Sequence, residues 1–277
     1  MNIDEVATGP DTTHLATAGA EHGPPVLFLH GTGPGATGAL SFAPILPALD
    51  RFRCLVPDLV GFGRSGHPQD VPAGPGPWFA RRVDAVLALL DTLGLDRVHV
   101  VGHSYGARVA LELILRVPDR VDRVVLLAAG GTPVKANLTT LTDFYGNPDE
   151  AAMGTLVDAQ LSRPVPGIEP YVTERLATAV RPEVQRSFQA AMGAGAPMPT
   201  YDETMLPAVS HPVLAVHGKD DATISADASL YLAEHLRHCD LHLYADCGHL
   251  LQYEVPTQLG ALIHDFLAPG LAEERSV

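Results

Sequence analysis

The sequence is poor in cysteine and contains no long apolar run. Its three cysteines, Cys54, Cys239 and Cys247, are too few and too odd in number for a disulfide framework, and they suit a reducing cytoplasm. No stretch approaches the roughly 20 apolar residues that span a bilayer, and residues 1–10 lack the basic and apolar regions of a secretory signal. We therefore expect a cytoplasmic protein with no membrane partner.

Basic residues are also scarce. The 277 residues include 18 Lys and Arg against 32 Asp and Glu, which gives a net charge of −14. Because phosphate backbones are bound by clustered Lys and Arg, this balance argues against nucleic acid as a partner. Apolar residues make up 46% of the chain, which is enough for a core. The composition therefore indicates a globular protein and leaves a small-molecule substrate open.

Short apolar runs alternate with longer helical patterns along most of the chain. Such runs are expected to form strands that are covered on both faces, as in a parallel sheet. The alternation predicts an α/β fold with a mostly parallel central sheet and helices on both of its faces. The expected strands are residues 25–30, 53–58, 98–102, 124–128, 213–217 and 241–244, and the expected helices are residues 78–93, 105–117, 226–238 and 255–267.

This alternation stops between residues 130 and 209, where Pro and Gly separate helical stretches. The stretches are residues 138–145, 149–161, 171–180 and 182–192. We interpret residues 131–208 as a helical cap inserted into a core made of residues 1–130 and 209–277. The cap is expected to cover the carboxyl edge of the sheet, where ligands bind in open α/β folds. A separate helical domain is the alternative.

The sequence Gly-His-Ser-Tyr-Gly at residues 102–106 lies between an expected strand and an expected helix. This is the setting of a nucleophile elbow, in which a strained turn presents Ser104 at a helix N-terminus. Glycines at 102 and 106 allow strand and helix to approach closely. The alternative is that Ser104 only caps the helix.

A serine hydroxyl needs an adjacent base to become nucleophilic at neutral pH. His249 follows the last expected strand, and Asp220 and Asp221 follow the strand before it. All three groups fall at carboxyl ends of strands, and the chain order Ser, Asp, His is the one expected for a triad on this architecture. We favour Asp221, three residues after Gly218, as the acid, and expect Asp220 to cap the turn.

The loop His-Gly-Thr-Gly-Pro-Gly-Ala at residues 30–36 follows the first expected buried strand. A tetrahedral intermediate needs two N–H donors for its oxyanion. We expect these to be the backbone N–H groups of Tyr105 and Thr32. The alternative is a flexible turn that contacts no ligand.

Two other patterns suggest cofactors only superficially. Residues 61–66 match Gly-x-Gly-x-x-Gly, but a turn sequence follows where a dinucleotide site needs a helix. The histidines and cysteines between residues 235 and 249 match no zinc-ligand spacing. We therefore expect neither a cofactor nor a metal.

Taken together, these elements resemble the α/β-hydrolase superfamily over nearly the whole chain. The loop at residues 30–36 is similar to that of the meta-cleavage product hydrolases, which cleave carbon–carbon bonds in 1,5-diketones formed by ring fission of catechols. Residues 56–65 and 247–249 are similar to general motifs of the superfamily. The resemblance implies an α/β-hydrolase fold with a cap inserted after the sixth strand, and a hydrolase of aromatic catabolism.

The resemblance also implies substrate contacts. The family holds the substrate's carboxylate and dienol oxygen with a cap arginine, and Arg175 falls where that arginine would be, with Arg181 and Arg186 as alternatives. Gly33 lies in the family's glycine-rich loop. Dimers are common in the superfamily, so a homodimer is an open expectation.

Three of the expected substrate-binding positions depart from the family's pattern. His103 stands where the family often has Asn before the nucleophile. Ser41 lies near a position where Asn is expected, and Leu250 replaces the Trp that commonly follows the catalytic histidine. The substrate class therefore stays open between a dienol-keto acid cleaved at a carbon–carbon bond and an ester or lactone. A non-hydrolytic or ligand-binding homologue is a further alternative.

Overall fold

The computed structural model describes residues 1–268, and in this range eight strands form a single sheet. The spatial order is β1-β2-β4-β3-β5-β6-β7-β8. Strands β1 and β2 form an antiparallel hairpin, β2 pairs antiparallel with β4, and the remaining pairs are parallel. The bounds are β1 (Asn2–Thr8), β2 (Asp11–Gly19), β3 (Pro25–Leu29), β4 (Arg53–Pro57), β5 (Val98–His103), β6 (Val121–Leu127), β7 (Val213–Gly218) and β8 (Cys239–Tyr244).

The six strands expected from apolar runs are β3 to β8. The hairpin β1–β2 was not expected, because β1 lies at the edge of the sheet with mostly exposed side chains and carries no apolar run. Several expected boundaries also differ by two or three residues. Strand β6 begins at Val121 instead of residue 124, and β8 begins at Cys239 instead of residue 241. The helix expected at 78–93 begins at Pro75, and the helix expected at 226–238 ends at His235.

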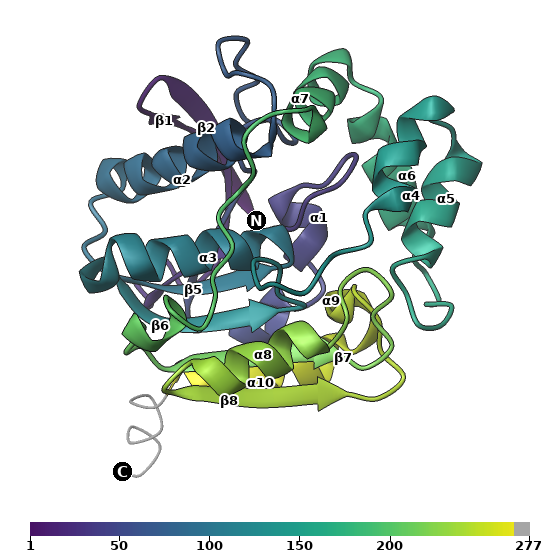
Figure 1. Ribbon diagram of the computed structural model, residues 1–277. Helices are drawn as coiled ribbons and strands as arrows, with labels where there is room; N and C mark the ends of the chain where they lie inside the picture. Colours follow the sequence, from purple (N-terminus) through teal and green to yellow (C-terminus); the bar gives the residue numbers. More distant parts are fainter. Residues whose placement is uncertain (269–277) are drawn as a thin grey trace.

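Helices cover both faces of the sheet (Figure 1). On one face pack α2 (Pro75–Thr92), α3 (Tyr105–Arg116) and α8 (Asp227–His235); on the other pack α1 (Gly38–Phe42), α9 (Leu251–Glu254) and α10 (Pro256–Leu267). Alternate side chains of β3 enter the two layers, because successive residues of a strand point to opposite faces. Leu27 and Leu29 join the first core and Val26 and Phe28 the second. Short 3-10 turns lie at Leu46–Leu49, Pro118–Arg120, Phe144–Gly146 and Leu206–Ala208.

Between β6 and β7 the chain forms helices α4 (Thr139–Asp143), α5 (Glu150–Asp158), α6 (Glu169–Ala179) and α7 (Pro182–Met192). Figure 1 shows these helices on the side of the molecule toward which β5, β6 and β8 point. They share a third apolar core, which includes Leu141, Phe144, Met153 and Phe188. This segment therefore lies over the carboxyl edge of the sheet, and its boundaries at 131 and 208 stay a prediction. We call residues 131–208 the cap.

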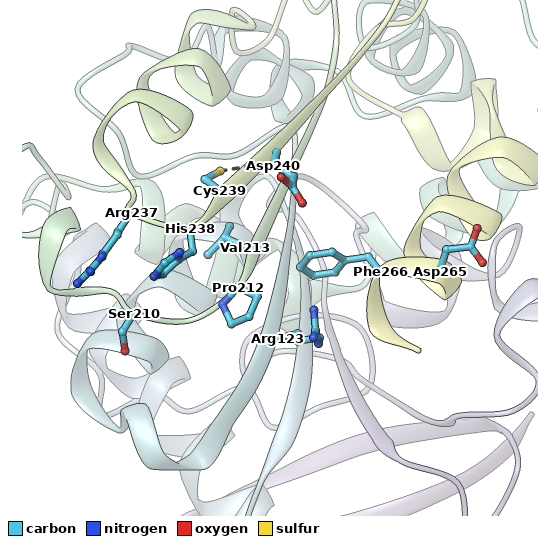
Figure 2. Close-up of a pocket in the computed structure, with 10 residues that line it drawn as sticks. All are labelled: Arg123, Ser210, Pro212, Val213, Arg237, His238, Cys239, Asp240, Asp265 and Phe266. Carbon is cyan, nitrogen blue, oxygen red and sulfur yellow. Dashed lines mark hydrogen bonds between the residues drawn. The ribbon is translucent and has the colours of Figure 1, made fainter. Parts of the chain in front are cut away.

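A cavity of about 750 Å³ lies at the amino ends of β7 and β8, away from the cap. Figure 2 shows its lining, which includes Arg123, Arg237 and Phe266. Ligands of open α/β sheets bind at the carboxyl ends of strands, so the candidate site lies at the other end of the sheet. Within residues 1–268, no helix is long and apolar enough to cross a membrane.

Candidate active site

Ser104 lies on the sharp turn between β5 and α3, with φ 54° and ψ −111°. An L-residue adopts such a positive φ only where the surrounding packing enforces it. That packing depends on two glycines. A Cβ at Gly106 would overlap the carbonyl oxygen of Leu29, and a Cβ at Gly102 would lie 2.5 Å from the Gly106 carbonyl oxygen. The local structure is therefore that of a nucleophile elbow.

The environment of Ser104 is well enclosed. The residue is 6% exposed, and its carbonyl oxygen accepts a hydrogen bond from the Gly130 N–H at 3.0 Å. Its Oγ takes part in no hydrogen bond with residues 1–268. Catalytic hydrogen bonds are often loose in the free enzyme and tighten with substrate, so the nucleophilic role of Ser104 belongs to the proposal below.

Asp221 and His249 form a close, buried pair. His249 Nδ1 lies 2.7 Å from Asp221 Oδ2, and both side chains are almost wholly enclosed. Asp221 Oδ1 accepts hydrogen bonds from the Thr223 and Ile224 N–H groups at 2.8 and 2.9 Å. Asp220, in contrast, is exposed. The structure thus places Asp221 against the histidine, in the geometry of a triad acid that fixes the imidazole tautomer.

A second histidine supports Asp221 from the opposite side. His217 is fully buried, and its Nε2–H donates to the Ile224 carbonyl oxygen at 2.9 Å and faces Asp221 Oδ2 at 3.2 Å. Burial alone would raise the pKa of the Asp221 carboxyl, but the neighbouring His249 and the hydrogen bonds hold this pKa far below its usual range. Asp221 is therefore ionised at neutral pH. Sequence reasoning missed His217, because a buried histidine inside a strand resembles a core residue.

His103 lies beside the imidazole of His249, with ring centroids 4.8 Å apart. Its Nε2–H donates to the His249 carbonyl oxygen at 2.9 Å, and its Nδ1 is buried without a partner among residues 1–268. Burial, together with the nearby His249, lowers the pKa of His103 to about 3. The neutral His103 ring thus connects the nucleophile turn to the loop that carries His249, which we call the histidine loop. The expected contact of His103 with substrate stays a prediction.

The glycine-rich loop at residues 30–36 packs against His103 and Ser104. A Cβ at Gly31 would lie 3.0 Å from His103 Nδ1 and 3.2 Å from Ser104 Cβ, so the loop touches the nucleophile turn. Within residues 1–268, the backbone N–H groups of Thr32 and Tyr105 have no hydrogen-bond partner. Two free donors near a nucleophile are what an oxyanion hole requires.

Arg175, on α6 of the cap, reaches the same loop. Its side chain is among the largest that are fully buried, and its Nε–H donates to the Pro34 carbonyl oxygen at 2.9 Å. A Cβ at Gly33, where φ is +143°, would lie 2.7 Å from Arg175 Nη2. The guanidinium therefore packs against the glycine-rich loop, on which Gly31 contacts Ser104.

The other expected substrate contacts lie in varied places. Arg186 is exposed, and Arg181 is half-buried and paired with Glu183 at 2.6 Å, so neither has the burial of Arg175. Leu250 is buried in the apolar core of the cap. Ser41 is half-buried at the end of α1, and none of the hydrogen bonds of residues 1–268 joins its side chain to this cluster.

The protein-family model described as the alpha/beta hydrolase fold matches residues 24–256 of this chain. The chain belongs to this family. It is 32% identical, over 95% of its length and 93% of the relative's, to 2-hydroxymuconate semialdehyde hydrolase of Pseudomonas sp. strain CF600. It is also 32% identical, over 95% of each chain, to 2-hydroxy-6-oxo-2,4-heptadienoate hydrolase of Pseudomonas putida strain F1.

Solved structures of similar proteins agree with this family assignment. The structure of 2-hydroxy-6-oxo-6-phenylhexa-2,4-dienoate hydrolase from Rhodococcus sp. strain RHA1 matches with a TM-score of 0.88 and 33% identity, covering 96% of this chain and 99% of that one. A carboxylesterase of Bacillus subtilis matches with a TM-score of 0.81 at 20% identity, which shows the fold alone. The expected fold and the resemblance to meta-cleavage product hydrolases are confirmed.

Two residues of this hydrolase that sequence reasoning missed join the cap to the histidine loop. The Gln160 carbonyl oxygen accepts the His249 N–H at 2.8 Å, while Gln160 Oε1 accepts from Arg175 Nη1 at 2.8 Å. The Glu254 carboxylate accepts the N–H groups of Gly248 and Ser162 at 2.8 and 2.9 Å. Neither residue lies in a motif, so the sequence carried no signal for them.

No cluster within residues 1–268 brings together three or more His, Cys, Asp or Glu side chains in a way that could hold a metal. The glycine-rich stretch 61–66 continues as a loop, and the next helix begins only at Pro75. The dinucleotide pattern thus lacks the helix N-terminus that would bind a pyrophosphate.

Proposed function

We propose that this hydrolase cleaves a carbon–carbon bond in a 2-hydroxy-6-oxo-dienoic acid, a product of aromatic ring fission. The observation that carries the proposal is Arg175, a buried guanidinium beneath the cap that has no carboxylate within 4 Å among residues 1–268. A buried charge is stable only with a partner. A substrate carboxylate would supply that partner at Nη2, the one guanidinium nitrogen that none of the hydrogen bonds of Arg175 within residues 1–268 uses. The names of the similar proteins, which refer to such dienoates and semialdehydes, support this choice.

In this proposal, Ser104 is the nucleophile, His249 the general base and Asp221 the group that orients the base. The substrate first changes from its dienol form to its keto form. The new carbonyl at C2 is conjugated with the carbon–carbon double bond that lies next to the scissile bond. Ser104 Oγ, or a water that His249 activates, then bonds to C6 while His249 Nε2 takes the proton. The bond between C5 and C6 breaks, and its electron pair passes into the conjugated ketone, which is protonated to a dienol. If Ser104 attacked, water then hydrolyses the acyl-enzyme and releases the acid; if water attacked, breaking the bond between C5 and C6 yields the acid directly.

The remaining candidate residues serve binding and charge stabilisation. The free N–H groups of Thr32 and Tyr105 would hold the oxyanion that forms at C6. Gly33 permits the approach of Arg175 to the loop, because any Cβ at that position would collide with the guanidinium. We further propose Ser41, His103 and Leu250 as the positions that shape the pocket around the dienoate.

An esterase or lactonase would use the same triad but would not need Arg175. The test therefore compares a ring-fission dienoate with a p-nitrophenyl ester in the wild type, Arg175→Met and Arg186→Met, whose side chain is exposed on the same cap. We expect Arg175→Met to lower the ratio of kcat/KM for dienoate to kcat/KM for ester by about 100-fold, as loss of a buried ion pair would. Arg186→Met should leave the ratio unchanged.

Ser104→Ala checks the nucleophile in both assays. We expect turnover of both substrates to fall by about three orders of magnitude or more. Equal losses on dienoate and ester in Arg175→Met would indicate that Arg175 only supports the fold, and efficient turnover of esters with none of dienoates would favour the esterase.

A further inference from the structure

His30, the first residue of the glycine-rich loop, is wholly buried and has a backbone partner at each ring nitrogen. Its Nδ1 lies 2.7 Å from the Gly31 carbonyl oxygen, and its Nε2 lies 2.9 Å from the backbone nitrogen of Leu59. Among residues 1–268, no other group donates a hydrogen bond to the Gly31 carbonyl oxygen. The His30 ring therefore connects the loop that follows β3 to the loop that follows β4.

The two partners of this ring allow it a single protonation state. A carbonyl oxygen only accepts and a backbone N–H only donates, so Nδ1 carries the hydrogen and Nε2 presents its lone pair. Burial lowers the pKa of His30, although the nearby Asp58 carboxylate acts in the opposite direction. The ring is therefore neutral at neutral pH, and its one N–H points at the Gly31 carbonyl oxygen.

The Gly31 carbonyl belongs to the same peptide unit as the Thr32 N–H, one of the two expected oxyanion donors. Because a peptide unit is planar and trans, its C=O and its N–H point in opposite directions. The Thr32 N–H has no partner of its own among residues 1–268. Its direction is thus set by the place where His30 holds the Gly31 oxygen.

This peptide unit needs such a restraint, because the residue before it is a glycine. A Cβ at Gly31 would lie 3.0 Å from His103 Nδ1 and 3.2 Å from Ser104 Cβ, so the close approach of the loop to the nucleophile turn favours glycine there. Glycine has little steric preference in φ and ψ, and the peptide unit that follows it can turn over at low cost. A flipped unit would present a carbonyl oxygen, instead of an N–H, to an anion.

We propose that His30 is a positioning residue of the oxyanion hole, where its Nδ1–H holds the Gly31 carbonyl so that the Thr32 N–H faces the oxyanion. The donor would then be fixed before the reaction begins, which is the condition for strong stabilisation of a developing charge. This inference rests on the nucleophile and the oxyanion hole of the proposed function. It applies equally to a dienoate and to an ester, since attack on either carbonyl forms an oxyanion.

Two substitutions separate the two hydrogen bonds of the ring. In His30→Asn, the amide NH₂ group takes the place of Nδ1 and can still donate to the Gly31 carbonyl, whereas the Leu59 N–H loses its acceptor. In His30→Gln, the amide oxygen takes the place of Nε2 and can still accept from Leu59, whereas the Gly31 carbonyl loses its donor. Each variant gives up one buried hydrogen bond to the backbone, so the midpoint of thermal unfolding should fall by similar amounts in both.

The catalytic effects of the two variants should differ. For a p-nitrophenyl ester, we expect kcat to fall about tenfold or more in His30→Gln with little change in KM, because an oxyanion donor acts mainly in the transition state. His30→Asn should keep kcat within about threefold of the wild-type value. The matched control is His211→Asn, which removes the bond from a buried Nε2–H to the Pro118 carbonyl oxygen at 2.9 Å, before β7 begins. It should lower the unfolding midpoint and leave kcat unchanged.

A second measurement follows the Thr32 amide directly. Phenylboronic acid forms a tetrahedral adduct with a nucleophilic serine, and ¹H–¹⁵N NMR shows whether the Thr32 N–H binds the oxygen of that adduct. We expect the amide proton of Thr32 to shift downfield on addition of the boronate in the wild type and in His30→Asn, and to shift less in His30→Gln. Ser104→Ala should show no shift.

Three results would overturn the positioning role. They are equal losses of kcat in His30→Asn and His30→Gln, an unchanged kcat in His30→Gln, and a wild-type Thr32 amide that the boronate leaves in place. The last of these needs no substitution, so it decides the matter even if neither variant folds. A wild type that turns over the ester but no dienoate contradicts the proposed carbon–carbon cleavage instead, and the ester assay then still decides the role of His30.

Discussion

The replacement Asp221→Asn tests the buried acid by exchanging one carboxylate oxygen for an NH₂ group. All four groups that face the Asp221 carboxylate are hydrogen-bond donors. They are the Nδ1 of His249, the Nε2 of His217 and the backbone N–H groups of Thr223 and Ile224. An asparagine has only one acceptor oxygen, so its NH₂ group must turn toward one pair of these donors.

The backbone decides which way the asparagine turns. If its NH₂ group faced Thr223 and Ile224, two buried N–H groups would lose their acceptor, at about 1–3 kcal/mol each. We therefore expect the NH₂ group to face His249 instead. His249 must then keep Nδ1 unprotonated and carry its proton on Nε2, where it cannot accept a proton from Ser104. Other Ser-His-Asp triads lose about 10⁴-fold in kcat from this change of tautomer, and we expect a similar loss here.

The assay is steady-state kcat on a p-nitrophenyl ester and on a ring-fission dienoate, combined with ¹⁵N NMR of the His249 ring. The matched control is Asp220→Asn, one residue earlier and exposed, which should retain nearly full activity. The reasoning is refuted if Asp221→Asn keeps more than about a tenth of the wild-type kcat, or if Asp220→Asn is equally damaging.

Three further predictions concern the surroundings of the triad. Glu254→Gln turns an NH₂ group toward the donors of Gly248 and Ser162, so we expect a loss of about 1–3 kcal/mol of stability in thermal unfolding and a lower kcat. Gly106→Ala should prevent correct folding of the elbow, because its Cβ would overlap a carbonyl oxygen of β3; circular dichroism and ester turnover measure this. The depressed pKa of Asp221 adds stability above its unfolded pKa of about 4, and this contribution is lost as pH falls through the folded pKa. Denaturant unfolding below about pH 4 should therefore show a steeper loss in the wild type than in Asp221→Asn.

The parts of this fold that could be predicted are those with strong local signals in the sequence. Strands β3 to β8 carry apolar runs, and Ser104, Asp221 and His249 each follow the end of such a strand. A parallel sheet brings these ends to one edge, so three distant residues could be placed together before any coordinates were known. The strained φ of Ser104 agrees with the same motif.

The parts that could not be predicted depend on contacts between distant segments. Gln160 acts partly through its backbone carbonyl, which every residue has, and Glu254 resembles any polar residue of a short helix. Strand β1 is mostly exposed and has no apolar run. The cytoplasmic location and the homodimer stay predictions.

Gln160 has a mechanical consequence for turnover. Its backbone carbonyl oxygen accepts the N–H of His249, and its side-chain oxygen accepts from Arg175. Gln160 therefore links the loop that carries the imidazole to the arginine of the cap. Because Gln160 and Arg175 both belong to residues 131–208, swinging this segment away to admit a reactant would break the bond from Gln160 to the imidazole-bearing loop. In the proposed mechanism, the general base would then keep both its contact with Asp221 and its contact with Gln160 only in the closed state, which would favour bond cleavage away from bulk water.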